Sequence, residues 1–190
     1  ETKDDPDLSL SAPFPIKKDS FYRKIFRDLT GITGYKRYSQ ALNSILNTEA
    51  KNSKEKLNKV WHKIHGFLIT NTIIFLMISI FFHWSLFFLL WWLPAFTYYS
   101  LIIRIRNIAE HSVTPGNNNF DNTRTTLTNP IVRFLMAPHR VNYHLEHHLF
   151  MMCPWYNLPK AHSMMIENGY EDRMCIANSY RSVLMKAVSA

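Results

Sequence analysis

Hydrophobic and polar positions divide the chain into three parts. Residues 1–63 are polar and basic, residues 64–103 are almost continuously apolar, and residues 104–190 are polar again and rich in His and Asn. The apolar part contains two runs without Asp, Glu, Lys or Arg, Ile64–Phe82 and Trp84–Ile103. As a helix each run would be about 30 Å long, which is enough to cross the hydrocarbon core of a bilayer. The pattern therefore predicts two membrane-spanning helices.

These two runs are predicted to form a helical hairpin with its turn at His83, Trp84 and Ser85. Trp and His suit the headgroup region of a membrane, whereas the hydrocarbon centre disfavours imidazole. Lysines precede the hairpin, and Arg104 and Arg106 follow it, so the positive-inside rule places both ends in the cytoplasm. The alternative is a hairpin buried in the core of a soluble protein, which so long an uncharged stretch disfavours. We therefore expect an integral, multi-pass membrane protein with its polar parts on the cytoplasmic side.

The first 63 residues are predicted to be an arm that lies along the membrane. Asp19 can cap a helix that places Phe21, Ile25 and Leu29 on one face, with basic residues elsewhere. This pattern suits an interfacial helix on anionic lipid, and it equally suits an amphipathic helix packed on protein. Both interpretations stay open.

The charge and composition of the chain limit the classes of partner and of fold that it can have. The 190 residues include 22 Lys and Arg against 14 Asp and Glu, a net charge of +8. Nucleic acid is not expected as a partner, because the basic residues bracket the apolar runs instead of forming a stripe beside a nucleic-acid-binding motif. With five Gly and no glycine-rich phosphate motif the chain does not predict a nucleotide-binding fold, and two Cys cannot build a disulfide framework. The charge instead fits an anionic membrane surface.

The spacing of three histidines carries the strongest chemical signal. His144, His147 and His148 form HxxHH within NYHLEHHLF. On a helix, positions i, i+3 and i+4 share a face, so the three imidazoles can converge while Leu145 and Glu146 point elsewhere. Imidazoles suit iron, zinc, copper or nickel. We predict a metal site here, the alternative being a solvated, His-rich helix face.

A second cluster follows the apolar runs in the segment RIRNIAEH. It places Asn107 and His111 at i and i+4 on a helix that continues from the second run, and we expect His111 to join the metal site. Glu110 either fixes an imidazole from behind as a hydrogen-bond acceptor or faces water. His139 could also lie behind the ligands, although an ordinary surface role fits it more simply, and His162 is expected at the surface.

The segment 116–126 is rich in Asn, Asp and Thr and predicts a loop across the polar part. Arg124 within it could contact a substrate headgroup. Solvation or a structural ion pair is the preferred interpretation of this side chain.

Together RIRNIAEH, NYHLEHHLF and the downstream NLPKAH resemble the C-terminal half of the integral-membrane fatty acid desaturases. The resemblance implies an all-α membrane protein in which the hairpin is half of a four-span bundle under a helical cytoplasmic cap. It also implies a centre of two irons held mainly by histidines from three boxes. His144, His147 and His148 match the third box, His111 matches an additional ligand position, and Asn107 matches a residue that reaches iron through a water.

Under this resemblance, residues 1–63 are the arm of the cap, 64–103 the transmembrane hairpin and 104–190 the cap that carries the third box. The implied activity is O2-dependent introduction of a double bond into an acyl chain, with a membrane lipid or acyl chain as substrate. Removing hydrogen from an unactivated methylene needs a redox cofactor, because such a C–H bond has no useful acidity. Electrons would come from a donor of the cytochrome b5 or ferredoxin type.

Two other functions stay open. Di-iron hydroxylases or ketolases of lipids or carotenoids share the histidine boxes and differ in the fate of the substrate. A non-catalytic two-span membrane protein that binds a metal belongs to another class.

The chain also departs from the family pattern. The first box, HxxxH, and the second, HxxHH, are absent, and His62 with His65 forms only HxxH at the start of the first apolar run. The chain begins at Glu1 without Met, and residues 2–10 resemble the segment that follows the second box. We therefore expect a C-terminal portion of a longer protein that is inactive in isolation.

Overall fold

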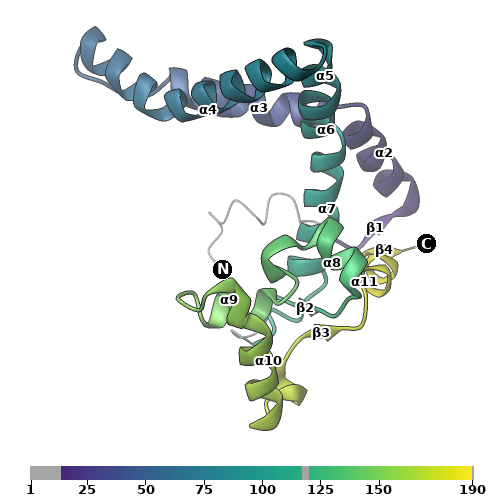
Figure 1. Cartoon of the computed structure of the whole chain (residues 1–190). Coiled ribbons are helices and arrows are strands. Elements are labelled where there is room, and N and C mark those ends of the chain that lie inside the picture. Colours follow the sequence, from purple (N-terminus) through teal and green to yellow (C-terminus); the bar gives the residue numbers. More distant parts are fainter. Residues whose placement is uncertain (1–13, 117–119, 190) are drawn as a thin grey trace. The chain divides into compact units, whose positions relative to one another are not determined.

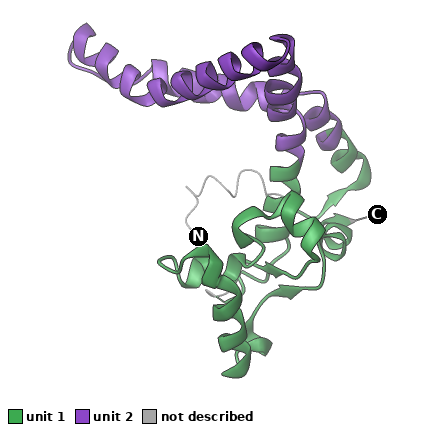
Figure 2. Cartoon of the chain, in the orientation of Figure 1, with its two compact units in different colours: residues 1–23, 102–190 green, residues 24–101 purple. Residues whose placement is uncertain are grey.

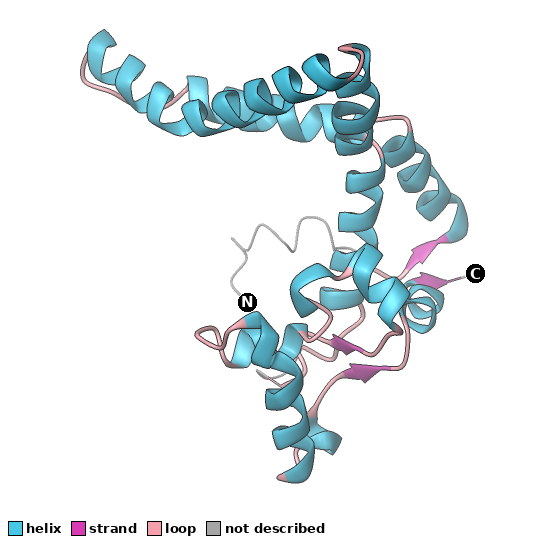
Figure 3. Cartoon of the chain, viewed as in Figure 1, coloured by secondary structure: helices cyan, strands magenta, loops and turns pink. Residues whose placement is uncertain are grey.

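The computed structural model describes residues 14–116 and 120–189. The chain forms two compact units, unit 1 of residues 1–23 and 102–190 and unit 2 of residues 24–101 (Figure 2). Most of the described residues are helical (Figure 3), which confirms the mostly helical fold. The segment 2–10, interpreted above from the family pattern, lies outside the described residues.

Unit 2 is built from helices of very different lengths (Figure 1). They are α2 (Lys18–Leu29, which starts in unit 1), α3 (Ile32–Leu46), α4 (Ser53–Phe81), α5 (Ser85–Phe87), the π-helix η1 (Phe88–Trp92), α6 (Leu93–Phe96) and the first turns of α7 (Tyr98–His111).

Two glycines shape the start of unit 2. Gly31 has a φ of 80°, a left-handed conformation that glycine adopts without strain, and it joins α2 to α3. A side chain on Gly34 would bring its Cβ 2.3 Å from the carbonyl oxygen of Phe96, so α3 packs against α6 with backbone nearly touching backbone.

Helix α2 only partly follows its prediction. It begins at Lys18, so Asp19 lies inside the first turn and is not the cap. Phe21 packs against the core of unit 1, whereas Leu29 is exposed. The predicted apolar face of Phe21, Ile25 and Leu29 is therefore buried at its start and exposed at its end.

The longest helix, α4, starts well before the apolar run that begins at Ile64. A capping box sets its start: the Asn52 side chain accepts a hydrogen bond from the Glu55 amide at 2.8 Å, and Glu55 accepts one from the Lys51 amide at 2.9 Å. Both α4 and the stretch Ser85–His111 are long and apolar enough to cross a membrane, judged by length and composition. None of the most apolar window of α4 is buried, which is the opposite of a helix in a soluble core.

The hairpin turn lies where the sequence predicts it. Helix α4 ends at Phe81 and α5 begins at Ser85, and the His83 imidazole lies 2.8 Å from the Ser85 hydroxyl in the turn. The two helical segments of the hairpin pack along each other. Trp91 donates a hydrogen bond of 3.0 Å to the Asn71 side chain, and the rings of Phe75 and Phe87 meet edge to face. Pro94, the second residue of α6, has no amide hydrogen to donate, and the π-helix η1 directly precedes α6.

Unit 1 combines short helices with two small pairs of strands. After α7 its elements are β2 (Thr125–Thr126), α8 (Pro130–Met136), η2 (Pro138–Arg140), α9 (His144–Leu149), η3 (Trp155–Asn157), α10 (Leu158–Glu167), η4 (Glu171–Arg173), β3 (Ile176–Ala177), α11 (Tyr180–Ala187) and β4 (Val188–Ser189), and β1 (Ile16–Lys17) precedes α2.

The strands run parallel in both pairs, and the all-α prediction did not include them. Ile16 lies opposite Val188 in the pair β1 and β4, and Thr125 lies opposite Ile176 in the pair β2 and β3. Three small apolar clusters support unit 1, and α7 supplies two of them with the fully buried Ile108 and Ala109. The last turns of α7 are therefore fixed in the core of this unit.

Candidate metal centre

The last residue of α7 is the first component of the site. Because α7 is anchored by Ile108 and Ala109, His111 follows a rigid helical turn and its side chain is buried. Asn107 lies one turn earlier on α7 and is also buried. The predicted i, i+4 relation of these two residues is present.

The HxxHH segment forms the second component. It folds into α9, a helix of six residues, with His144 buried at its first position. Leu145 points into an apolar cluster with Met165 and Met174, so the opposite face of the helix is free to present histidines. His144 and His148, one turn apart, lie on this presenting face and His148 is the more exposed of the two.

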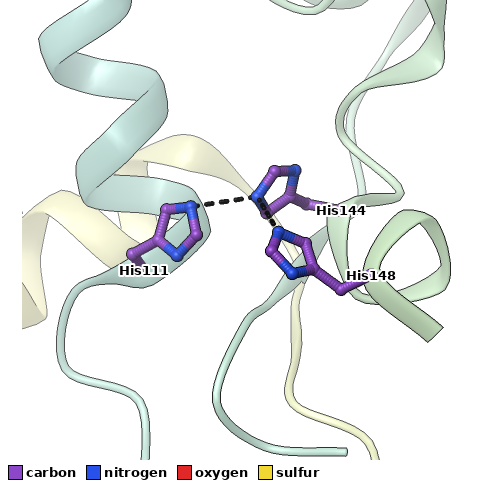
Figure 4. Close-up of side chains that lie close together, drawn as sticks. All are labelled: His111, His144 and His148. Atoms are coloured by element: carbon purple, nitrogen blue, oxygen red, sulfur yellow. Dashed lines mark hydrogen bonds between the residues drawn. The ribbon is translucent and has the colours of Figure 1, made fainter. Parts of the chain in front are cut away.

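Three imidazoles converge between α7 and α9 (Figure 4). The Nε2 atom of His144 lies 3.0 Å from Nε2 of His111 and 3.0 Å from Nε2 of His148. A ligand atom of each residue lies within 4.8 Å of the others, so one metal ion could reach all three. Among the described residues, these three histidines form the group of His, Cys, Asp or Glu side chains that lie close enough together to hold a metal ion.

Two further predicted ligands lie outside this group. His147 is exposed, and its ring centroid is 5.9 Å from those of both His144 and His148. Asn107 is buried one turn before His111, and an amide side chain is not among the ligand types that define the three-histidine group. Their direct or water-mediated binding to a metal stays a prediction.

The local electrostatics favour the form of histidine that binds metals. Burial lowers the pKa of His144 well below its ordinary value, and the positive charge that the imidazoles of His111, His148 and His147 would carry lowers it further. A neutral imidazole keeps the nitrogen lone pair that a metal ion needs. Three imidazoles form a donor set that fits iron and other first-row transition metals.

Glu146 is the functional residue that the sequence interpretation missed. It points away from the three histidines, as expected, but it is fully buried between two polar partners. Its Oε1 lies 2.6 Å from Nδ1 of His162, and its Oε2 accepts a hydrogen bond from the Thr125 hydroxyl. A buried carboxylate needs such partners, because leaving it unpaired would be costly.

The surface position predicted for His162 is therefore wrong. Its side chain is 15% exposed, and α10, on which it lies, packs beside α9. A signal was present in the sequence: His162 shares one helical face with Leu158 and Met165, both of which are buried.

The sequence leaves Glu110 either behind an imidazole or facing water, and it makes His139 only a weak candidate for such support. Glu110 does not face water, since it is buried and accepts a hydrogen bond of 3.1 Å from Nε of Arg106. His139 is exposed on η2, and its ring packs edge to face against Trp155 at 5.2 Å between centroids. Their support of an imidazole stays a prediction.

Arg124 is not solvated, and it binds backbone oxygens beside the candidate site. Its side chain is 4% exposed, and it donates hydrogen bonds to the carbonyl oxygens of Ala109 at 3.0 Å and Val113 at 2.8 Å. These carbonyls belong to the C-terminal end of α7 and the residues after it. Arg124 thus satisfies backbone groups that the end of a helix leaves unpaired, directly beside His111.

Comparison with known proteins adds one finding. A family model described as fatty acid desaturase matches residues 1–176, which include His111, all of α9 and His162. No curated protein and no solved structure matches the chain.

Proposed function

Because the chain belongs to the fatty acid desaturase family, we propose that it serves O2-dependent desaturation of an acyl chain at a di-iron centre. The observation that carries the proposal is the convergence of His111 from α7 with His144 and His148 from α9. Two segments that are far apart in the sequence thereby form one transition-metal site, with the donor atoms that iron accepts.

We propose His111, His144 and His148 as iron ligands, with His147 as a fourth histidine and Asn107 acting through a water. The 190 residues contain one HxxHH and no separate HxxxH outside it. We propose these ligands as part of a two-iron set, whose remaining ligands the family resemblance assigns to the first two boxes.

Bound iron would supply the redox chemistry with O2 that side chains lack. Overall, two hydrogens leave neighbouring carbons of the acyl chain, a donor gives two electrons, two protons are taken up, and O2 is reduced to two waters. The chain's own residues hold the imidazole of His144 neutral, and the buried side chains around it limit the access of water.

The membrane arrangement is also a proposal. The apolar helices would span the bilayer as a hairpin, with residues 1–63 as an arm and 104–190 in a cytoplasmic cap. The exposed apolar side chains of α4 support lipid contact, because water would not tolerate so large an apolar surface. A membrane lipid or acyl chain is the proposed substrate. Nucleic acid is not proposed as a partner.

The proposed electron donor is a protein of the cytochrome b5 or ferredoxin type. The net charge of +8 supports docking of an acidic partner. Hydroxylation or ketolation of a lipid or carotenoid would use the same ligands, so the product decides between these reactions.

The test is lipid analysis of cells that express the natural coding sequence together with a donor. Gas chromatography of membrane fatty acids should show a new double bond with the wild-type protein and with His62→Ala, whose histidine is exposed and lies outside the cluster. The His144→Ala variant should give none. A hydroxylated or oxidised product would favour the alternative reaction, and equal products from wild type and His144→Ala would contradict the proposed site.

A further inference from the structure

The segment Thr123–Thr126 is polar yet almost completely buried. Its four residues are at most 4% exposed, although the composition of the segment predicts a loop. Polar side chains are withdrawn from water at a cost unless they find partners. The partners of Arg124 and Thr125 lie on the two elements that carry the histidines.

Arg124 holds the C-terminal end of α7, which carries His111. Besides the side-chain bonds to Ala109 and Val113, its backbone amide donates to the Glu110 carbonyl at 2.9 Å. Val113 has a φ of 53°, a left-handed conformation that a β-branched residue rarely adopts. The guanidinium therefore holds the strained backbone directly after His111.

Thr125 fixes the α9 side. Its hydroxyl donates to Oε2 of Glu146, the residue directly before His147, and its backbone forms a bridge with Tyr143. The second carboxylate oxygen of Glu146 is bound by His162 from α10.

A helix of six residues such as α9 does not hold its own orientation, because isolated helices of this length are unstable. Its direction must come from tertiary contacts. Buried apolar packing through Leu145 supplies one contact, and the two bonds of Glu146 add directional ones. Arg124 binds the end of α7 and the next residue, Thr125, binds Glu146 of α9. Two consecutive residues thus connect the two elements that carry the histidines.

We propose that Arg124, Thr125, Glu146 and His162 form a positioning clamp that sets the separation of His111 from His144 and His148 and so preorganises the metal centre. The proposal rests on the proposed metal-binding function. None of the four touches the metal in this account, and each acts through the backbone or helix that carries a ligand. Partners that orient ligands in this way commonly control metal affinity.

The sharpest test compares two neighbouring threonines. Thr125→Val removes the hydroxyl that binds Glu146 and keeps the shape of the side chain. Thr126→Val is the matched control, because the Thr126 hydroxyl is equally buried and has no hydrogen-bond partner among the described residues. Glu146→Gln, with exposed Glu167→Gln on α10 as its control, probes the same link from α9.

Binding of Co2+ to the purified natural protein in detergent gives the readout, by absorption spectrum and by competition with a chromophoric chelator. We expect Thr125→Val and Glu146→Gln to bind about tenfold more weakly and with an altered spectrum, the size typical of losing a ligand-orienting group. Thr126→Val and Glu167→Gln should match the wild type. Circular dichroism and thermal unfolding of the metal-free proteins are measured in parallel.

Wild-type affinity and spectrum in Thr125→Val and Glu146→Gln would overturn the clamp while leaving the metal centre intact. Loss of helical structure in both metal-free variants would also overturn it, in favour of a general role in folding. A wild-type protein that binds no Co2+ would instead contradict the proposed function, and the clamp with it.

Discussion

Unit 1 buries many polar side chains, whereas unit 2 leaves many large apolar side chains exposed. Arg124 and Glu146 are buried in unit 1 with their hydrogen-bond partners around three histidines. In unit 2, Ile73 and Phe81 of α4 are 52% and 72% exposed. Unit 1 thus has the character of a preorganised polar site, and unit 2 that of a surface suited to lipid.

The largest expected effect concerns the centre of unit 1. His144→Ala should abolish binding of Fe2+ or Co2+ at the three-histidine group, because Nε2 of His144 lies 3.0 Å from both other imidazoles. Metal content per chain after removal of free metal measures this. The matched variant His62→Ala should keep wild-type content, and retention of metal by His144→Ala would place the site elsewhere.

The next effect tests the apolar surface of unit 2. Ile73→Lys places a charge in the apolar part of α4 and should disfavour membrane insertion by about 3 kcal/mol. Leu57→Lys changes an exposed residue of the same helix before the apolar run and should have little effect. A glycosylation-based insertion assay reports both. Equal, small effects would show that α4 does not span a membrane.

A smaller effect distinguishes two glycines of unit 2. Gly34→Ala should destabilise the packing of α3 on α6 by about 1–3 kcal/mol, because its Cβ would overlap the backbone of Phe96. Gly66→Ala should be neutral or stabilise by up to about 1 kcal/mol, since its Cβ meets no heavy atom within 4 Å. Unfolding in mixed micelles measures the pair, and equal stabilities would contradict the close contact.

The smallest effect lies inside the hairpin. A double-mutant cycle of Asn71→Leu and Trp91→Phe should give a coupling energy of about 0.6 kcal/mol, the usual size for a hydrogen bond between membrane helices. Helix-pair unfolding in lipid provides the four stabilities. No coupling would mean that the hydrogen bond contributes nothing to the hairpin.

The two units also differ in how far the sequence predicts them. The turn at His83 and the apolar helices of the hairpin follow from hydropathy alone, since long uncharged runs have few alternatives. His111 lies beside His144 and His148, as expected, because positions i and i+4 of a helix share a face. His147 was expected on the same face, but it is exposed and lies outside the three-histidine group. The start of α4 could have been found from its capping signal at Asn52.

The clamp could not be predicted with the same ease. Glu146 pairs with a residue on another helix, and such partners depend on how α10 packs against α9. The strands of two residues are too short to produce an alternating pattern, so Thr125 carried no strand signal. Arg124 looked solvent-exposed because it lies in a loop-like composition, although its partners are backbone carbonyls that the sequence does not reveal.

Iron-edge X-ray absorption of the purified natural protein and of its His144→Ala variant is the most direct test of whether His111, His144 and His148 bind iron. We expect iron with strong imidazole scattering in the wild type and fewer imidazoles per iron in the variant. Iron without imidazole scattering, or the same spectrum from both proteins, would contradict the assignment of His111, His144 and His148 to the metal centre.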